Sequence, residues 1–236
     1  KKAQHELITF SLMYAFSENY ILPLSHDEVV HCKKSLLSKM PFDYDYKFSS
    51  LRLFYGYMMA HPGKKILFMG GEFGQFIEWD PNKGLDWLLL EYPMHKKLQQ
   101  YTKALNEFYK GEKALWQNDH TSDGFDWIDS NNSNQSIISF TRIAYDKDDY
   151  LIVVCNFSQV SYGVYKIGVP KLVNYVEVFN SDNSMFGGND KLNNKIILSI
   201  PEKWNNRPYC VNIILPALSI IFIKEEKQTR YFIKNK

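Results

Sequence analysis

Two apolar runs in the first half of the chain stop at clusters of polar residues. Residues 20–24 (YILPL) lead into the segment SHDE at residues 25–28, and residues 65–69 (KILFM) lead into a Gly-Gly-Glu segment. Between them, apolar side chains recur at helical spacing over residues 45–61. In α/β proteins, the groups that handle ligands lie just beyond the carboxyl ends of parallel strands. The pattern therefore indicates strand–helix units of a (β/α) barrel.

Two further helices are predicted around these strands. Residues 6–16 are apolar enough for a buried helix, and residues 95–110 form an amphipathic helix that ends at Gly111. This order supplies only a pair of parallel strands, which cannot bury both faces of their sheet. Either the strands join a larger sheet outside this chain or another copy completes it. Because exposed strand edges invite pairing, we expect self-association.

The pattern changes near residue 112. Short apolar runs now alternate with turn residues such as Asn, Asp, Gly and Pro, which is typical of an antiparallel β-sandwich. The predicted strands cover residues 125–128, 136–142, 150–156, 164–169, 175–180, 195–200, 210–215 and 219–224. We therefore predict an α/β domain over residues 1–112 and an all-β domain over residues 113–236.

Composition narrows the classes of function. A net charge of +2 gives no strong field for binding nucleic acid or a membrane surface. The most apolar stretch, residues 213–223, is broken by Pro216 and is shorter than the roughly 20 residues of a membrane span. The three cysteines are far apart in the sequence, which favours a reducing cytoplasm over a disulfide framework. The 16 Tyr, 16 Phe and 5 Trp suit a core, and aromatic faces also stack on sugar rings.

The polar segment after the first strand has two interpretations. His26, Asp27 and Glu28 could bind sugar hydroxyls, and a carboxylate there could stabilise an oxocarbenium-like charge. Alternatively, Ser25 or Asp27 could simply cap a following helical turn. A zinc site is disfavoured, because the two histidines of HDEVVH are five residues apart instead of four.

The segment after the second strand also has two interpretations. Glu72, Glu78 and Trp79 follow that strand and could either line a cleft or decorate an exposed loop. We favour the wall of a substrate site, because this loop leaves the same edge of the predicted barrel as His26 and Asp27.

Longer stretches of sequence point to a family. They are YAFSENYILPLSHDEVVH, KFSSLRLFYGYMMAHPGKKILFMGGEFGQFIEWD, DGFDWIDSNNSNQSIISFTR and LPALSIIFIK. With these stretches the chain resembles the glycogen (1,4-α-glucan) branching enzymes of the α-amylase superfamily over essentially its whole length. Amylases share a short His-Asp element, but SHDE together with MGGEFGQ is typical of branching enzymes.

The resemblance implies a fold and an activity. Residues 1–112 correspond to the C-terminal portion of a catalytic (β/α)8 barrel, from helix six to helix eight, with Lys1 just before helix six. Residues 113–236 correspond to the C-terminal β-sandwich. The implied activity is a hexosyl transfer in cytoplasmic glycogen synthesis. A segment of α-1,4-glucan moves to a 6-hydroxyl and forms an α-1,6 branch, without a metal or organic cofactor.

The resemblance also assigns roles to residues. Asp27 matches the third catalytic carboxylate of the family, which holds sugar hydroxyls and distorts the ring toward the transition state. His26 is expected to bind hydroxyls of the same glucose. The resemblance carries only these two roles, while Glu28, Glu72 and Trp79 are candidates for further glucan contacts because of their places after the two strands. Cys32 stands where the family usually has Gly, and we expect the fold to survive it.

The family's other two catalytic groups have no counterpart in this sequence. They are an Asp nucleophile and a Glu acid/base, which follow the fourth and fifth barrel strands. We therefore expect this chain alone to be inactive. Two alternatives stay open: an amylase-type α-glucan hydrolase, and a glucan-binding fragment without catalysis.

Overall fold

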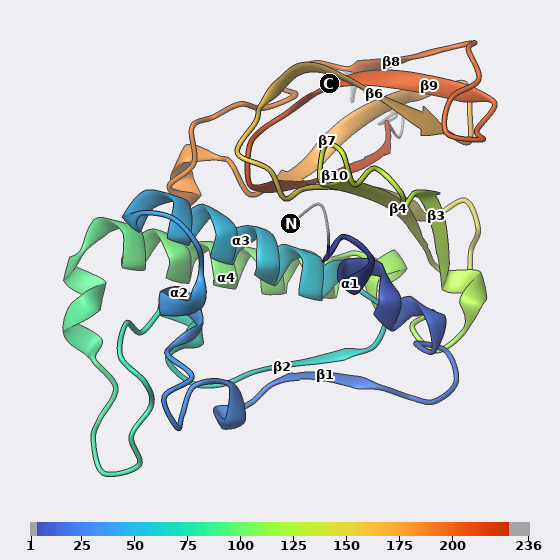
Figure 1. Cartoon of the computed structure of the whole chain (residues 1–236). Coiled ribbons are helices and arrows are strands. Elements are labelled where there is room, and N and C mark those ends of the chain that lie inside the picture. Colours follow the sequence, from blue (N-terminus) through green and yellow to red (C-terminus); the bar gives the residue numbers. More distant parts are fainter. Residues whose placement is uncertain (1–3, 227–236) are drawn as a thin grey trace, which may run out of the picture.

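The computed structural model describes residues 4–226, so Lys1 lies outside the described residues. The chain is layered (Figure 1). The parallel strands β1 (Ile21–Leu24) and β2 (Lys64–Leu67) form one side, helices α3 (Tyr44–Ala60) and α4 (Pro93–Gly111) the middle, and antiparallel strands the other side. The predicted combination of barrel-like elements and an all-β region is confirmed.

The two long helices follow the sequence closely. The Asp43 carboxylate accepts a hydrogen bond from the Tyr46 amide and so caps the start of α3, whereas α4 begins at Pro93, which needs no amide donor there. α3 is buried on most sides because it lies between the parallel strands and the β region. α4 buries only the face that carries Leu98, Tyr101 and Leu105. Both predicted helices are confirmed to within two residues.

The first predicted helix is wrong in extent. Residues 6–16 contain only α1 (Glu6–Thr9) and the 3-10 helix η2 (Phe10–Met13). No residue of α1 or η2 is buried, and Leu7 and Met13 are largely exposed. Their apolar density therefore reflects a surface that the described chain leaves open. The remaining short helices are α2 (Leu36–Lys39), η3 (His26–Glu28), η4 (Gly71–Phe73), η5 (Trp87–Glu91), η6 (Lys113–Leu115), η7 (Ser122–Gly124) and η8 (Ser184–Phe186).

The parallel pair presents two unlike faces. The strands run in register from Ile21 opposite Lys64 to Leu24 opposite Leu67. Leu22, Leu24 and Leu67 pack against the cluster around α3. Ile21 and Ile66 point the other way and are about half exposed. The pair therefore buries one face, as the sequence predicts for a sheet of two strands.

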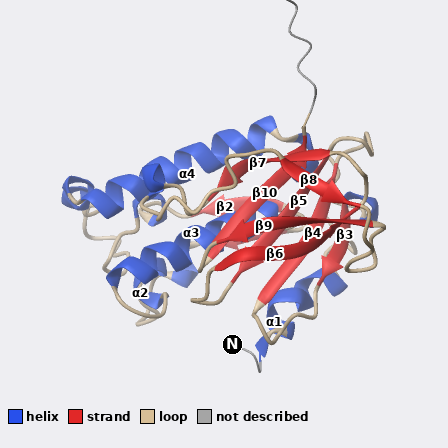
Figure 2. Cartoon of the chain, turned by 90° about the horizontal axis from the view of Figure 1, so that it is seen from above, coloured by secondary structure: helices blue, strands red, loops and turns tan. Residues whose placement is uncertain are grey.

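Every strand predicted in the second half is confirmed, with boundaries shifted by no more than two residues. The strands are β3 (Phe125–Asp129), β4 (Ile137–Ile143), β5 (Tyr150–Asn156), β6 (Tyr162–Val169), β7 (Asn174–Asn180), β8 (Ile197–Ile200), β9 (Tyr209–Leu215) and β10 (Ser219–Glu225). They pair in the order β3-β4-β5-β10-β7-β8-β9-β6, and all pairs are antiparallel. β8 passes from the inner layer to the outer one, because its first residues pair with β7 and its last with β9. Figure 2 shows β6 and β9 lying over the inner strands.

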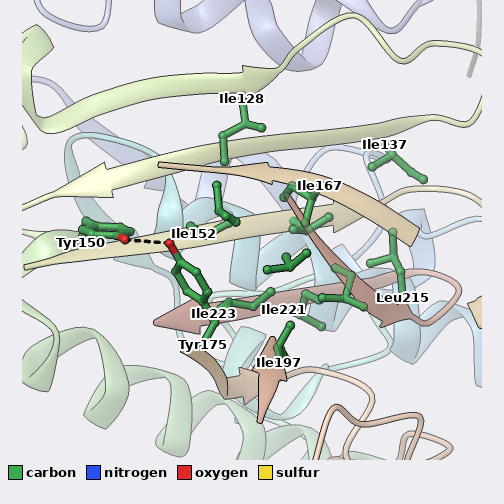
Figure 3. Close-up of a cluster of buried hydrophobic side chains, with 14 residues drawn as sticks. Ile128, Ile137, Tyr150, Ile152, Ile167, Tyr175, Ile197, Leu215, Ile221 and Ile223 are labelled. Atoms are coloured by element: carbon green, nitrogen blue, oxygen red, sulfur yellow. Dashed lines mark hydrogen bonds between the residues drawn. The ribbon is translucent and has the colours of Figure 1, made fainter. Parts of the chain in front are cut away.

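Apolar clusters fill the spaces between these layers. Ile152, Ile221 and Ile223 face Ile167 across the sandwich (Figure 3), and Val211 of β9 belongs to the same cluster. The opposite face of the inner layer packs on the helices through a separate cluster that includes Phe140 and Phe222.

Two details fix this core. Near one end of the sandwich cluster, the Tyr150 and Tyr175 hydroxyls lie 3.1 Å apart and pair with each other (Figure 3). Between α3 and β10, Gly56 allows a close approach, because a Cβ there would come within 2.4 Å of Ile220 Cγ2. Burial on both faces explains the continuous apolar runs of β5 and β10.

A buried arginine joins the helical part to the β region. The fully buried Arg142 of β4 donates to the carbonyl of Ala60 (2.7 Å), at the end of α3, and to that of Gly124 (3.2 Å). Its Nη2 also lies 2.7 Å from Asp119 Oδ1, while Lys64 Nζ lies 2.9 Å from Asp119 Oδ2. One side chain thus contacts the end of a helix, the connecting segment and the first strands of the sandwich.

Candidate active-site wall

The polar segment after β1 forms a single tight turn. The Ser25 hydroxyl accepts a hydrogen bond from the Asp27 amide (3.3 Å) and caps η3. The capping role considered from sequence therefore belongs to Ser25. Because Ser25 supplies the cap, the Asp27 carboxylate stays free for other contacts.

Asp27 projects into solvent beside His26. Its side chain is 70% exposed, and its Oδ1 lies 3.5 Å from His26 Nε2. Its Oδ2 accepts a hydrogen bond of 3.3 Å from the Ser25 hydroxyl. Both contacts are long, so the carboxylate keeps most of its capacity to accept hydrogen bonds from hydroxyl groups. Lys33 Nζ donates to the Asp27 carbonyl (2.7 Å) and fixes the backbone of the turn.

Aromatic rings stand behind this pair. The His26 ring lies 6.0 Å from the Phe68 ring and 6.2 Å from the Trp79 ring, measured between centroids. Phe68 and Trp79 meet edge to face at 5.2 Å. The structure thus brings Trp79 from the loop after β2 to the residues after β1, as the shared barrel edge predicts. Phe68 has no role in the sequence argument, although its place at the end of the second apolar run is the signal that could have found it.

Glu28 and Glu72 are placed differently from Asp27. Lys39 of α2 contacts Glu28 twice. Its Nζ lies 3.3 Å from Glu28 Oε2 and also donates to the Glu28 carbonyl, so the Glu28 side chain is held against α2. Glu72 is half-buried in η4, and its carbonyl accepts a hydrogen bond from the Thr102 hydroxyl (3.1 Å). Within residues 4–226, no hydrogen bond, ion pair or ring contact joins Glu72 to His26 or Asp27.

Glu78 organises the loop beside the site. Its carboxylate accepts hydrogen bonds from the amides of Cys32 (3.1 Å) and Lys34 (2.5 Å). Both of those residues have left-handed backbones, with φ of 63° and 68°. The left-handed φ at Cys32 gives a physical reason for the Gly expected at that position, since Gly adopts it without steric cost.

A small apolar hollow lies beneath these residues. Its wall includes Val29, Leu37, Phe68 and Trp79. The Trp79 amide donates to the Val29 carbonyl (3.0 Å) and ties the two loops together. The hollow is too small to hold a sugar ring, so its walls serve to pack the loops after β1 and β2 against each other.

The described part of the chain offers neither a metal site nor a membrane-spanning helix. Across residues 4–226, no three His, Cys, Asp or Glu side chains are grouped so that they could hold a metal ion. Among the same residues, no helix combines the length and apolar character of a membrane span.

Comparison with known proteins gives consistent matches. Residues 127–226 match the family described as alpha amylase, C-terminal all-beta domain. Over 228 aligned residues the chain is 59% identical to the 1,4-alpha-glucan branching enzyme of Halothermothrix orenii. This alignment covers 97% of this chain and 36% of that protein. The chain is homologous to the C-terminal portion of 1,4-alpha-glucan branching enzymes.

Other branching enzymes match in the same way. The enzyme of Bacillus cereus strain AH187 is 52% identical over 227 residues, covering 96% of this chain and 35% of that protein. That of Geobacillus stearothermophilus is 51% identical over 228 residues, covering 97% and 36%. The chain thus spans about a third of the length of these branching enzymes. The helices and parallel strands agree with the end of an α-amylase-type barrel, and the antiparallel strands agree with the C-terminal all-β domain.

Proposed function

We propose that this chain forms part of a 1,4-α-glucan branching enzyme and supplies one wall of its glucan site. The observation that supports the proposal most directly is the exposed Asp27 carboxylate beside His26 at the end of β1. The enzyme cleaves an α-1,4-glucan and transfers the segment to a 6-hydroxyl, which creates an α-1,6 branch. The proposed division of the chain is a barrel portion over residues 1–112 and a sandwich over residues 113–236.

In this proposal Asp27 acts on hydroxyls of the glucose whose bond is cleaved. As positive charge develops at the anomeric carbon, the hydroxyls become better donors and their hydrogen bonds to the carboxylate strengthen. His26 holds a hydroxyl of the same sugar, and Trp79 supports the imidazole ring through the edge contact described above. Glu28 and Glu72 take weaker contacts with the glucan at the rim.

The nucleophile and the acid/base of the reaction come from another part of the enzyme. We therefore propose that this chain alone forms no branches. The exposed face of β1 and β2, with Ile21 and Ile66, is where the rest of a barrel packs, or where copies associate when it is missing. The free thiols of Cys32, Cys155 and Cys210 support placing the enzyme in the cytoplasm.

A chimeric enzyme tests the proposal. The matching segment of the Halothermothrix orenii enzyme is replaced by this chain, and new α-1,6 linkages in amylose are followed by proton NMR. We expect branching by the chimera and a loss of at least about 100-fold for Asp27→Asn, because an interaction that strengthens in the transition state is removed. Asp123→Asn, an exposed carboxylate at the start of the β region, is the matched control and should keep full activity.

Other outcomes separate the alternatives. New reducing ends and short sugars without α-1,6 linkages would establish an amylase-type hydrolase instead. Branching by the isolated chain would contradict the proposed absence of the other catalytic groups. Undiminished branching by the Asp27→Asn chimera would show that Asp27 has no part in the reaction.

A further inference from the structure

The connection between β8 and β9 is a tight turn that displays an indole ring. Trp204 and Arg207 exchange two backbone hydrogen bonds, of 3.1 and 2.8 Å. Asn205 and Asn206, which lie between them, have φ of 45° and 58°. A hairpin turn of this type requires left-handed backbone at both central residues, and Asn tolerates that conformation better than most residues.

Contacts with neighbouring strands hold the turn in place. The Asn205 side-chain oxygen accepts a hydrogen bond from the Gly168 amide (3.1 Å) on β6. Arg207 reaches β3, where it pairs with the Asp126 carboxylate (2.5 Å) and donates to the carbonyl of Trp127 (2.9 Å). The Trp204 backbone lies against β6 so closely that a Cβ at Gly168 would come within 2.2 Å of the Trp204 carbonyl oxygen. The turn is therefore anchored without any ligand.

Despite this anchoring, Trp204 remains 42% exposed. It belongs to none of the three apolar clusters found within residues 4–226. Lys166 Nζ lies 4.9 Å from the ring centroid and orients the indole through a cation–π contact. A rigid, exposed indole that adds nothing to the core is typical of a binding surface, since little conformational entropy is lost when a ligand meets it.

Polar side chains surround the ring. An open hollow is lined by residues 203–208. Among the described residues, no hydrogen bond or ion pair engages the side chains of Lys203 and Asn206, and both residues are exposed. An amide and an ammonium group beside an aromatic face match the hydroxyl edge and the C–H face of a pyranose.

We propose that this turn, the Trp204 platform, is a second α-glucan-binding site, separate from the candidate wall formed by His26, Asp27 and Trp79. The platform lies on the outer layer of the sandwich, beyond β8 and β9, whereas η3 lies below the helices beside the ends of β1 and β2 (Figure 1). It binds a helical turn of the polymer through stacking on Trp204 and hydrogen bonds to Asn206. Because it raises the local concentration of chain ends, it favours long glucans over short ones. The choice of an α-glucan as ligand rests on the proposed function.

Affinity electrophoresis of the purified 236-residue chain in native gels containing glycogen tests the platform. We expect the wild-type chain to be retarded and Trp204→Ala to raise the apparent dissociation constant about tenfold, as the loss of an aromatic anchor commonly does. Trp204→Phe keeps an aromatic face and should retain most of the retardation, which separates stacking from folding. Tyr145→Ala removes another exposed aromatic ring of the β region and is the matched control.

The outcomes distinguish this site from the catalytic wall. Absence of retardation for the wild type, or equal retardation of Trp204→Ala, overturns the Trp204 platform. Retardation lost in His26→Ala but kept in Trp204→Ala places glucan binding at the wall, so the platform fails while the proposed function stands. Retardation that depends on Trp204, combined with a chimera that forms no branches, would leave the platform standing and refute the proposed function.

Discussion

The parallel pair and the antiparallel sandwich differ in how they use apolar residues. All seven residues of β5 are buried, because the helices cover one face and the outer layer covers the other. In β1 and β2, every second residue is exposed. The sandwich therefore completes its own core, while the parallel pair completes only half of one. The candidate catalytic carboxylate lies on the open region, and the proposed Trp204 platform lies on the region whose strands are covered on both faces.

Removing one apolar side chain from each region should give very different costs. Phe222→Ala should lower the free energy of unfolding by about 3–5 kcal/mol, because the ring is fully buried between β10 and the helices. In the monomer, Ile66→Ala should change it by no more than about 0.5 kcal/mol, because Ile66 is 47% exposed. Urea denaturation of the two variants and the wild type measures both values.

The same pair of variants tests self-association. A cost above about 2 kcal/mol for Ile66→Ala would mean that another copy covers the open face, since truncation of a buried residue costs that much. Light scattering should then show an oligomer that Ile66→Lys dissociates. If the chain is a monomer and Ile66→Ala still lowers the free energy of unfolding by more than about 2 kcal/mol, the proposed difference between the two regions is wrong.

A buried histidine at the end of α3 should make stability depend on pH. Burial lowers the pKa of His61 from its ordinary value near 6.5 to about 4, and repulsion from Lys65 and Arg142 adds to this effect. Between these two values the unfolded chain binds more protons than the folded one, so stability rises with pH from about 4 to 6.5. His61→Gln should remove on the order of 2–3 kcal/mol of that rise.

Unfolding measured at pH 4.5 and pH 7 checks this prediction. His120→Gln is the matched control, because His120 is exposed, and its profile should follow the wild type. An equally steep rise in the His61→Gln variant would assign the pH dependence to other groups.

The smallest predicted effect concerns the loop after the candidate site. Cys32→Gly should raise the free energy of unfolding by about 1 kcal/mol, because a non-glycine residue with φ of 63° carries backbone strain. Thermal unfolding of the two proteins measures the change. Cys155→Gly, at a fully buried position of β5, is the control and should lower the free energy of unfolding. A Cys32→Gly variant that is less stable than the wild type would show that the backbone at Cys32 carries no such strain.

Local sequence patterns were sufficient for most of the fold. Asp43 before α3 and Pro93 at the start of α4 mark helix starts, and short apolar runs between turn residues mark the strands of the sandwich. The order of the strands did not follow from the sequence, because β10 lies between β5 and β7 and such pairing depends on packing across the whole region. The long buried helix predicted over residues 6–16 is wrong for a related reason. An apolar pattern does not show which other part of a protein, if any, packs against it.

The candidate site was predictable only in part. The shared edge of two parallel strands brought His26 and Trp79 together as expected. Glu78, by contrast, acts through the amides of Cys32 and Lys34, and a contact between a side chain and distant backbone leaves no periodic signal. Whether Glu28, Glu72 and Asp27 contact glucan stays a prediction for the chimera to test.

The Arg142 junction has a consequence for how the chain unfolds. Opening the sandwich would leave the Asp119 carboxylate and the Ala60 carbonyl without the Arg142 guanidinium. Pulling α3 and β2 away would take the Ala60 carbonyl from the guanidinium and Lys64 from the Asp119 carboxylate. Burial raises the pKa of Asp119, but attraction to Lys65 and Arg142 outweighs it and keeps that pKa below its ordinary value, so the group is charged at neutral pH. Separating a buried charge pair is costly, and neither side can melt alone without that cost. The barrel elements and the sandwich should therefore lose their amide-exchange protection together, as a single cooperative unit with no hinge near residue 112.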